Sequence, residues 1–213
     1  MDINIVHALV ASTSKLTTKE RANELMKIEG NMRGDLLKNN YIYLSKKEGE
    51  SAIKRMEKKL EELGYPLNFE DINPMKWYKD PFCSVFMLSF KEEFGWSEED
   101  IFNLGRFSPQ YSMVIKVALR HILTTKKAFD FGQRLWSRNV DYGNLESHEY
   151  NVEKKYLIYR LKDYALHPLV CIYIRGYLTS LFEQIVGKDK VKVEETACVF
   201  KGSKYHEYKI QWE

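Results

Sequence analysis

The sequence PLVCIYIRGYLTSLFEQIVG, at residues 168–187, decides the fold of this chain. Proline is favoured in the first turn of a helix and glycine directly after the last one, so Pro168 and Gly187 bound a predicted helix. Apolar residues recur between them at helical spacing: Cys171, Ile174, Leu178, Leu181, Phe182 and Ile185. We therefore expect a long helix whose apolar residues pack against the rest of the domain.

Two runs typical of β-strands follow this helix, at 190–200 and 204–212. Lys201-Gly202-Ser203 between them suits a three-residue turn, and in that register Cys198 lies opposite His206. A further strand is expected over 150–164, where the side-chain pattern alternates. The predicted fold class is α+β: an antiparallel sheet with helices packed on it, in which a C-terminal helix precedes a β-hairpin.

The region upstream is predicted to be mainly helical. Apolar residues over 53–63 share one face, and Gly64 and Pro66 end that helix. The segment 81–94 is apolar around most of its circumference, so it should be buried on more than one side. Shorter helices are expected over 97–105 and 108–122, and a short strand over 41–44.

The chain is expected to consist of an N-terminal helical extension, 1–30, and one α+β domain, 31–213. Thr17 and Glu20 have the spacing of a capping box, which predicts a charged helix that ends near Gly30. No repeat, low-complexity tract or long linker interrupts the remaining sequence. The second segment is therefore read as a single ligand-binding-like domain.

Composition limits the class of protein. The 213 residues are 44% hydrophobic and 30% charged, which is typical of a globular chain rather than a disordered one. A net charge of +3 gives no reason to expect a nucleic-acid or membrane-surface partner. Three scattered cysteines do not form a secreted disulfide framework, and no apolar run approaches 18 residues. We expect a cytoplasmic protein.

Several short motifs carry a resemblance to a known superfamily. They are Tyr159-Arg160-Leu161, the helix around Gly176, the hairpin that ends at Trp212, and the segment FGWSEEDIFNLGR at 94–106. Together they resemble ligand-binding domains that include the 4-vinyl reductase domain, the haem nitric-oxide/oxygen-binding (H-NOX) domain and small subunits of the transport protein particle. The resemblance implies an H-NOX/4-vinyl reductase-like fold that encloses a ligand between helices and sheet.

Most of the residues that hold haem in the gas sensors are missing here, although Tyr159 matches the tyrosine of their propionate clamp. Counting forward from Gly105, the iron-binding histidine would fall near Leu135 or Trp136. The Tyr-x-Ser-x-Arg propionate clamp would fall at Tyr159, Leu161 and Asp163, where leucine cannot donate a hydrogen bond and aspartate repels a carboxylate. Haem is therefore not expected.

Aromatic residues offer a candidate ligand site instead. Phe82, Phe86, Phe90, Trp136 and Tyr159 are predicted to line an apolar cavity, since such cavities combine apolar walls with a few polar tips. A closed aromatic core explains the same residues and stays open as an alternative. His121 is interpreted as a residue on a helix surface rather than a catalytic base.

The terminal hairpin offers a candidate metal site. Cys198 and His206, on adjacent strands, supply two zinc ligands, and Cys171 or His167 would complete the set. The alternative is that Cys198 is a small buried hydrophobic residue and His206 lies on the rim. The sequence leaves both open.

These observations favour a non-haem sensor or regulatory domain that binds a hydrophobic or aromatic small molecule and forms a homodimer. The alternatives are a scaffold or assembly module with a filled core, or a zinc-binding variant of the same fold. No Walker, Rossmann, HExxH or GxSxG pattern is present, so no enzymatic activity is expected. Vinyl reduction would rest only on the name of one resembling family.

Overall fold

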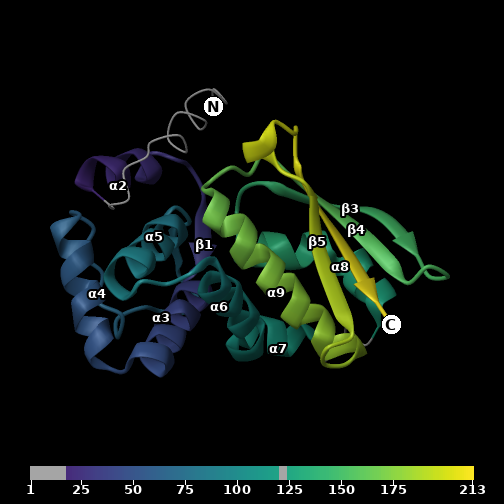
Figure 1. Ribbon diagram of the computed structural model, residues 1–213, viewed down its shortest axis with the longest axis horizontal. Helices are drawn as coiled ribbons and strands as arrows, with labels where there is room; N and C mark the ends of the chain where they lie inside the picture. The colour runs from purple at the N-terminus through teal and green to yellow at the C-terminus, as the bar shows by residue number, and fades with distance from the viewer. Residues whose placement is uncertain (1–17, 120–123) are drawn as a thin grey trace.

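A computed structural model describes residues 18–119 and 124–213, except for the side chains of 113, 114 and 118. Helices α2 to α5 form one end of the molecule and a four-stranded sheet forms the other, with α6 and α9 between them (Figure 1). The helices are α2 (Lys19–Met26), α3 (Gly34–Glu48), α4 (Ser51–Glu62), α5 (Phe82–Phe94), α6 (Glu98–Tyr111), α7 (Met113–Leu119), α8 (Thr125–Asn139) and α9 (Pro168–Val186). The strands are β1 (Asn31–Arg33), β2 (Trp77–Lys79), β3 (Asn144–Asn151), β4 (Tyr156–Lys162), β5 (Val191–Ala197) and β6 (His206–Trp212).

The large sheet is antiparallel throughout, in the order β3-β4-β6-β5, and β1 and β2 form a separate small sheet. Its inner face follows the two-residue period of strands, with Leu157, Tyr159 and Leu161 of β4 buried. Helices α8 and α9 pack against the sheet, the first chiefly at β3 and the second at β5. The α+β class and the C-terminal helix followed by a hairpin are confirmed.

The single strand expected over 150–164 is two strands. Residues 152–155 form a turn between β3 and β4, in which Lys155 has a φ of 49° and the Asn151 side chain accepts a hydrogen bond from the Lys154 N–H at 2.8 Å. The alternating pattern hides this turn, because Val152 lies at a position where a continuous strand would also have an apolar residue. In the structure Val152 is exposed.

The terminal hairpin is confirmed with a longer connection than predicted. Glu195 pairs with Tyr208 and Ala197 with Glu207, so the register shifts by one residue between them. A 3₁₀ turn over Val199–Lys201 follows, closed by the Ser203 N–H on the Cys198 carbonyl at 3.1 Å. This bulge lets Glu195 and Cys198 face the same side of the sheet.

The predictions for the helical half need three corrections. Residues 41–44 belong to α3 rather than a strand, because Leu37 and Leu44 are buried at helical spacing and packing overrides strand propensity. Gly105 does not end a helix, and Pro109 does not begin one, since both lie inside α6. Helix α2 is capped by Thr18, whose hydroxyl accepts from the Arg21 N–H at 3.2 Å, whereas Thr17 lies outside the described residues.

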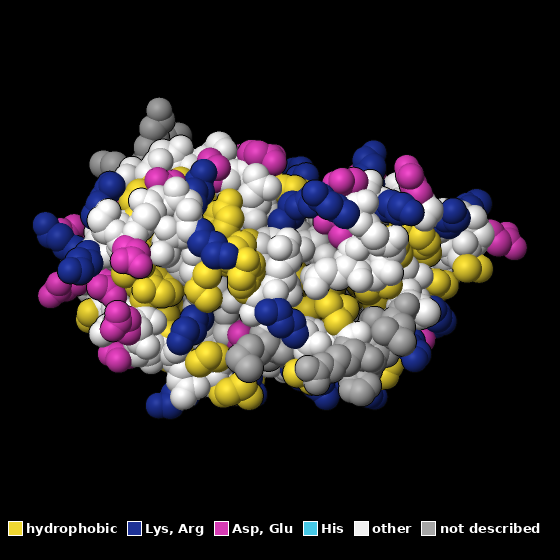
Figure 2. All heavy atoms as spheres, turned by 90° about the horizontal axis from the view of Figure 1, so that it is seen from below, with side chains coloured by type: hydrophobic (Ala, Val, Ile, Leu, Met, Phe, Trp, Pro, Cys, Tyr) yellow, Lys and Arg dark blue, Asp and Glu magenta, His cyan; other side chains and the backbone are white. Residues whose placement is uncertain are grey.

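Basic and acidic side chains are interspersed on the face shown in Figure 2, with apolar side chains between them, so no extended area of one sign appears there. Helix α9 has the length and composition of a membrane span. Of its most apolar window, 56% is buried inside the protein, as expected for the core helix of a folded domain.

Helices α6 and α9 approach so closely that glycine is required on both sides. A Cβ added to Gly105 would lie 2.1 Å from the Tyr173 carbonyl oxygen, and one added to Gly176 would lie 2.0 Å from the Phe102 carbonyl oxygen. Both obstacles are backbone atoms, which cannot rotate away. This contact fixes the position of α9 between the helical end and the sheet.

Gly176→Ala is therefore expected to lower the free energy of unfolding by about 3 kcal/mol or more, because α9 must move away from α6. Urea unfolding measures this loss. Gly49→Ala is the control: its φ is +86° and nothing lies within 4 Å of an added Cβ, so only backbone strain of about 1–2 kcal/mol is expected. Equal losses in the two variants would contradict the account of the helix contact.

His167 caps the N-terminus of α9. Its Nδ1 accepts a hydrogen bond from the Leu169 N–H at 3.2 Å, and its Nε2 lies 3.4 Å from the Arg21 guanidinium. Burial first, and then the charge of Arg21, lower the pKa of His167 to about 4. The cap therefore requires the neutral ring.

The unfolded chain takes up the His167 proton near pH 6.5 and the folded chain only near pH 4, so this residue should make the protein less stable as pH falls between those values. His167→Asn keeps a capping side chain without this titration. The difference in free energy of unfolding between variant and parent should therefore shift by about 2–3 kcal/mol in favour of the variant when the pH is lowered from 7 to 4.5. Parallel pH profiles in urea unfolding would show that His167 contributes nothing.

Candidate ligand cavity and candidate metal centre

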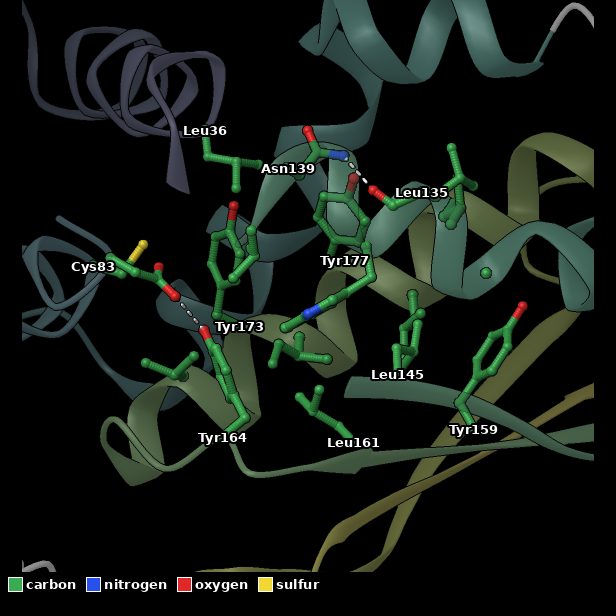
Figure 3. A pocket seen from close by; sticks show the side chains of 18 of the residues that line it. Leu36, Cys83, Leu135, Asn139, Leu145, Tyr159, Leu161, Tyr164, Tyr173 and Tyr177 are labelled. Carbon is green, nitrogen blue, oxygen red and sulfur yellow. Dashed lines mark hydrogen bonds between the residues drawn. The ribbon is translucent and has the colours of Figure 1, made fainter. Parts of the chain in front are cut away.

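A cavity of about 100 Å³ lies between α8, α9 and the inner face of the sheet (Figure 3). This volume is of the order of engineered cavities that hold one benzene ring. Its walls are mostly apolar or aromatic side chains from both halves of the molecule. The lining residues include Leu36, Cys83, Ile115, Leu135, Trp136, Leu145, Tyr159, Leu161, Val170, Tyr173, Ile174, Tyr177, Leu178 and Leu181.

Two of the five predicted lining residues, Trp136 and Tyr159, line this cavity. Phe82, Phe86 and Phe90 do not, which corrects the sequence prediction. They follow one another at four-residue spacing along α5 and stack together in the helical end, with ring centroids 5.9–6.0 Å apart. Their neighbours there include Phe69 and Trp96, so these three rings form the closed aromatic core that the sequence left as an alternative.

Tyr159 is held firmly against α8. Its hydroxyl donates to the Ala128 carbonyl at 2.7 Å, and its ring lies 2.7–2.8 Å from the position that a Cβ on Gly132 would take. Trp136, one turn further along α8, donates its indole N–H to the Tyr142 carbonyl at 3.0 Å. The polar atoms of both side chains are therefore satisfied by backbone, which leaves their ring surfaces for the cavity.

The cavity also has polar groups. Asp80 is 1% exposed, accepts a hydrogen bond from the Tyr164 hydroxyl at 3.1 Å, and has its pKa raised to about 7, chiefly by burial. Asn139 donates its amide N–H to the Leu135 carbonyl at 2.9 Å, whereas its buried Oδ1 has no hydrogen-bond partner among the described residues. An unpaired buried acceptor is costly, so Asn139 favours a ligand that donates to it.

The described residues do not suit haem. Leu135 and Trp136, at the expected place of the iron ligand, line the cavity, and no histidine, lysine or arginine is among the described lining residues. Leu161 lines the cavity where the clamp would need a hydroxyl, and Asp163 is exposed in the loop before α9. Pockets that enclose ligands of cofactor size have about 300–1,000 Å³, several times this volume. His121 lies outside the described residues.

A second cluster lies where α9 meets the terminal hairpin. One ligand atom from each of Cys171, Glu195, Cys198 and His206 lies within 4.8 Å of the others. The two sulfurs are 4.0 Å apart, the Cys171 sulfur is 3.6 Å from His206 Nδ1, and that nitrogen is 2.9 Å from Glu195 Oε1. Tetrahedral zinc with these ligands has edges of roughly 3.3–3.8 Å, so small side-chain movements would complete the geometry.

The orientation of His206 suits a metal ligand. Its Nε2 lies 3.0 Å from the Tyr164 carbonyl oxygen, which can only accept, so Nε2 carries a proton and donates it. Nδ1 is thereby directed into the cluster. A second hydrogen bond of this kind fixes the ring and tautomer of most metal-binding histidines.

The cluster holds negative charge in a buried place. The hydrogen bond from Cys171 lowers the pKa of Cys198 to about 6, while the same pairing and burial raise the pKa of Cys171. Burial alone would raise the pKa of Glu195 and lower that of His206, but their mutual hydrogen bond reverses both shifts. A thiolate and a carboxylate that face one imidazole form a donor set suited to a divalent cation.

The structure thus brings together the predicted Cys171, Cys198 and His206. His167 lies outside the group, since it caps α9. Glu195 was missed by the sequence analysis. The signal was present, because Val193 and Glu195 are two residues apart on a strand and therefore face the same side, and Val193 is buried.

The chain is similar in structure to H-NOX proteins. An oxygen-binding H-NOX domain related to soluble guanylate cyclases, in its oxygen complex, matches with a TM-score of 0.62 and 13% identity over 85% of this chain and 95% of that one. An H-NOX protein from S. oneidensis in its Fe(II)NO state matches with a TM-score of 0.58 and 12% identity over 85% and 99%. No protein-family model matches the sequence, and neither does any curated protein.

At this identity the comparison establishes the fold and not the ligand. The links to 4-vinyl reductase domains and to transport-particle subunits stay predictions from the sequence. The H-NOX part of the resemblance is confirmed at the level of architecture: this chain has an H-NOX-like fold.

Proposed function

We propose that this chain is a non-haem sensor or regulatory domain, in which the cavity between α8, α9 and the sheet binds a small hydrophobic or aromatic molecule. The observation that carries the proposal is the cavity itself, which is lined by Leu135, Trp136 and Leu161 where the resemblance to gas sensors would require haem-holding residues. An apolar ligand that buries about 200 Å² contributes roughly 5 kcal/mol before the cost of association. Weak to micromolar binding is thus consistent with the size of the site.

The scaffold alternative requires a filled core at this place. Phe82, Phe86 and Phe90 fill the helical end in that way, but the space beside Trp136 and Tyr159 is not filled in the described residues. This contrast favours a ligand. The homodimer and the cytoplasmic location expected from the sequence remain parts of the proposal, and light scattering tests the former.

Toluene is expected to bind the cavity, to raise Tm, and to shift the NMR signals of the indole N–H of Trp136. Leu145→Phe should abolish these effects, because Leu145 lines the cavity at 8% exposure and a larger side chain there occupies the space. Phe86→Leu is the matched control: it loosens the helical end but should leave the affinity for toluene unchanged.

Binding of toluene with equal affinity to the parent and to a folded Leu145→Phe variant would place the ligand elsewhere. Absence of any binding to the parent would contradict the proposed function.

We also propose that Cys171, Glu195, Cys198 and His206 hold one structural zinc ion. Four protein ligands, three of them buried, support a closed site rather than a catalytic one. When bound, zinc supplies a cross-link between α9 and the hairpin. The chain's own contribution is the Tyr164 carbonyl, which orients His206.

Elemental analysis of the purified chain should give one zinc per molecule, and a strong chelator should lower Tm by roughly 10 °C, since the apo form loses a few kcal/mol. Cys198→Ser should lose the zinc. Cys83→Ser is the control, because Cys83 is also buried but lies outside the cluster. Full zinc content in Cys198→Ser, or none in the parent, would contradict the assignment.

A further inference from the structure

The acidic group of the cavity lies at one end. In Figure 3, Cys83, Tyr164 and Tyr173 lie on one side, and Leu135, Leu145 and Tyr159 lie on the other. The hydroxyl of Tyr164 donates to Asp80 Oδ2 at 3.1 Å, so this carboxyl belongs to the polar end. A ligand that fills the cavity would therefore place an apolar ring at one end and a polar group at the other.

The group at this end, Asp80, is acidic, and the described cavity wall offers it no basic partner. Asp80 lies two residues before the first residue of α5 and is 1% exposed. None of the described lining residues is a lysine, an arginine or a histidine. Asp141, which binds the Asn31 N–H at 2.6 Å, adds a second carboxylate nearby. An anionic ligand would be repelled here, whereas a cation would be attracted.

One further polar group of the cavity, the side-chain oxygen of Asn139, also needs a donor. Asn139 is 6% exposed, and its Oδ1 has no hydrogen-bond partner among the described residues. Burial raises the pKa of Asp80 to about 7, and no cation among the described lining residues opposes this shift. A neighbouring cation would reverse that shift.

We propose that the cavity selects a small ring compound that carries a protonated amine, with the ring against Trp136 and Leu145 and the ammonium group hydrogen-bonded to Asp80. This inference rests on the proposed ligand-binding function and specifies the chemical class of the ligand. It makes Asp80 the residue that determines specificity. Tyr164 is a positioning residue, since its hydroxyl holds the carboxyl in place.

Four probes of similar size separate charge from shape: benzylamine, benzyl alcohol, toluene and benzoate. Calorimetric titration of the full chain should show benzylamine binding at least about tenfold more tightly than benzyl alcohol or toluene, and no binding of benzoate. Asp80→Asn keeps the shape and removes the charge. In that variant benzylamine should bind no more tightly than benzyl alcohol, while toluene should keep its affinity.

Tyr164→Phe provides a second variant in case Asp80→Asn does not fold. It leaves the carboxyl but removes the hydroxyl that holds it and lowers its pKa, so the preference for benzylamine over benzyl alcohol should weaken, while toluene should keep its affinity. Toluene binding with no preference for benzylamine would overturn this inference and leave the proposed function standing. Failure of all four probes to bind would overturn both.

Discussion

The close contact between α6 and α9, which only glycine at 105 and 176 permits, is the constraint on which the other features of this structure depend. It brings the two backbones together and so sets the position of α9 relative to the helical end. From that position α9 presents Val170, Ile174 and Tyr177 to the cavity. The adjacent Cys171 reaches the hairpin and meets Cys198 and His206. One helix therefore borders both candidate sites, and a displacement of α9 would alter them together.

The cavity and the Cys171–Glu195–Cys198–His206 cluster differ in what surrounds their polar groups. In the cavity, apolar and aromatic walls leave space that the described side chains do not fill, and a buried carboxyl lies at one end. In the cluster, three buried side chains and the half-buried Glu195 contact each other, and hydrogen bonds between them shift their pKa values. Tyr164 connects the two, because its carbonyl accepts from His206 while its hydroxyl donates to Asp80. In both sites a buried ionisable side chain, Asp80 or His206, thus has a hydrogen-bond partner on Tyr164, as burial of a charge requires.

Local signals in the sequence were sufficient for the C-terminal part of the fold. Pro168 and Gly187 mark the ends of α9, and the hairpin brings Cys198 near His206. The same kind of signal failed at Gly105 and Pro109, because this glycine serves a contact with a distant helix rather than the end of its own. Spacing within one segment carries no information about that partner.

The candidate sites were predicted in part for similar reasons. Trp136 and Tyr159 line the cavity, whereas Phe82, Phe86 and Phe90 lie in the closed core, because a filled core and a cavity wall have the same composition. Glu195 was missed because a carboxylate on a strand is usually read as solvent-facing. Only the bulge after it explains how Glu195 and Cys198 both turn inward.

The central claim is that an H-NOX-like fold here encloses a cavity for something other than haem. Titration of the purified full chain with hemin, followed by absorbance, tests this claim most directly. The account predicts no saturable complex, since the described cavity offers neither an axial imidazole nor a cation for the propionates and is too small for the macrocycle. A stoichiometric complex with a sharp Soret band, lost in Leu145→Phe but retained in Phe86→Leu, would contradict it.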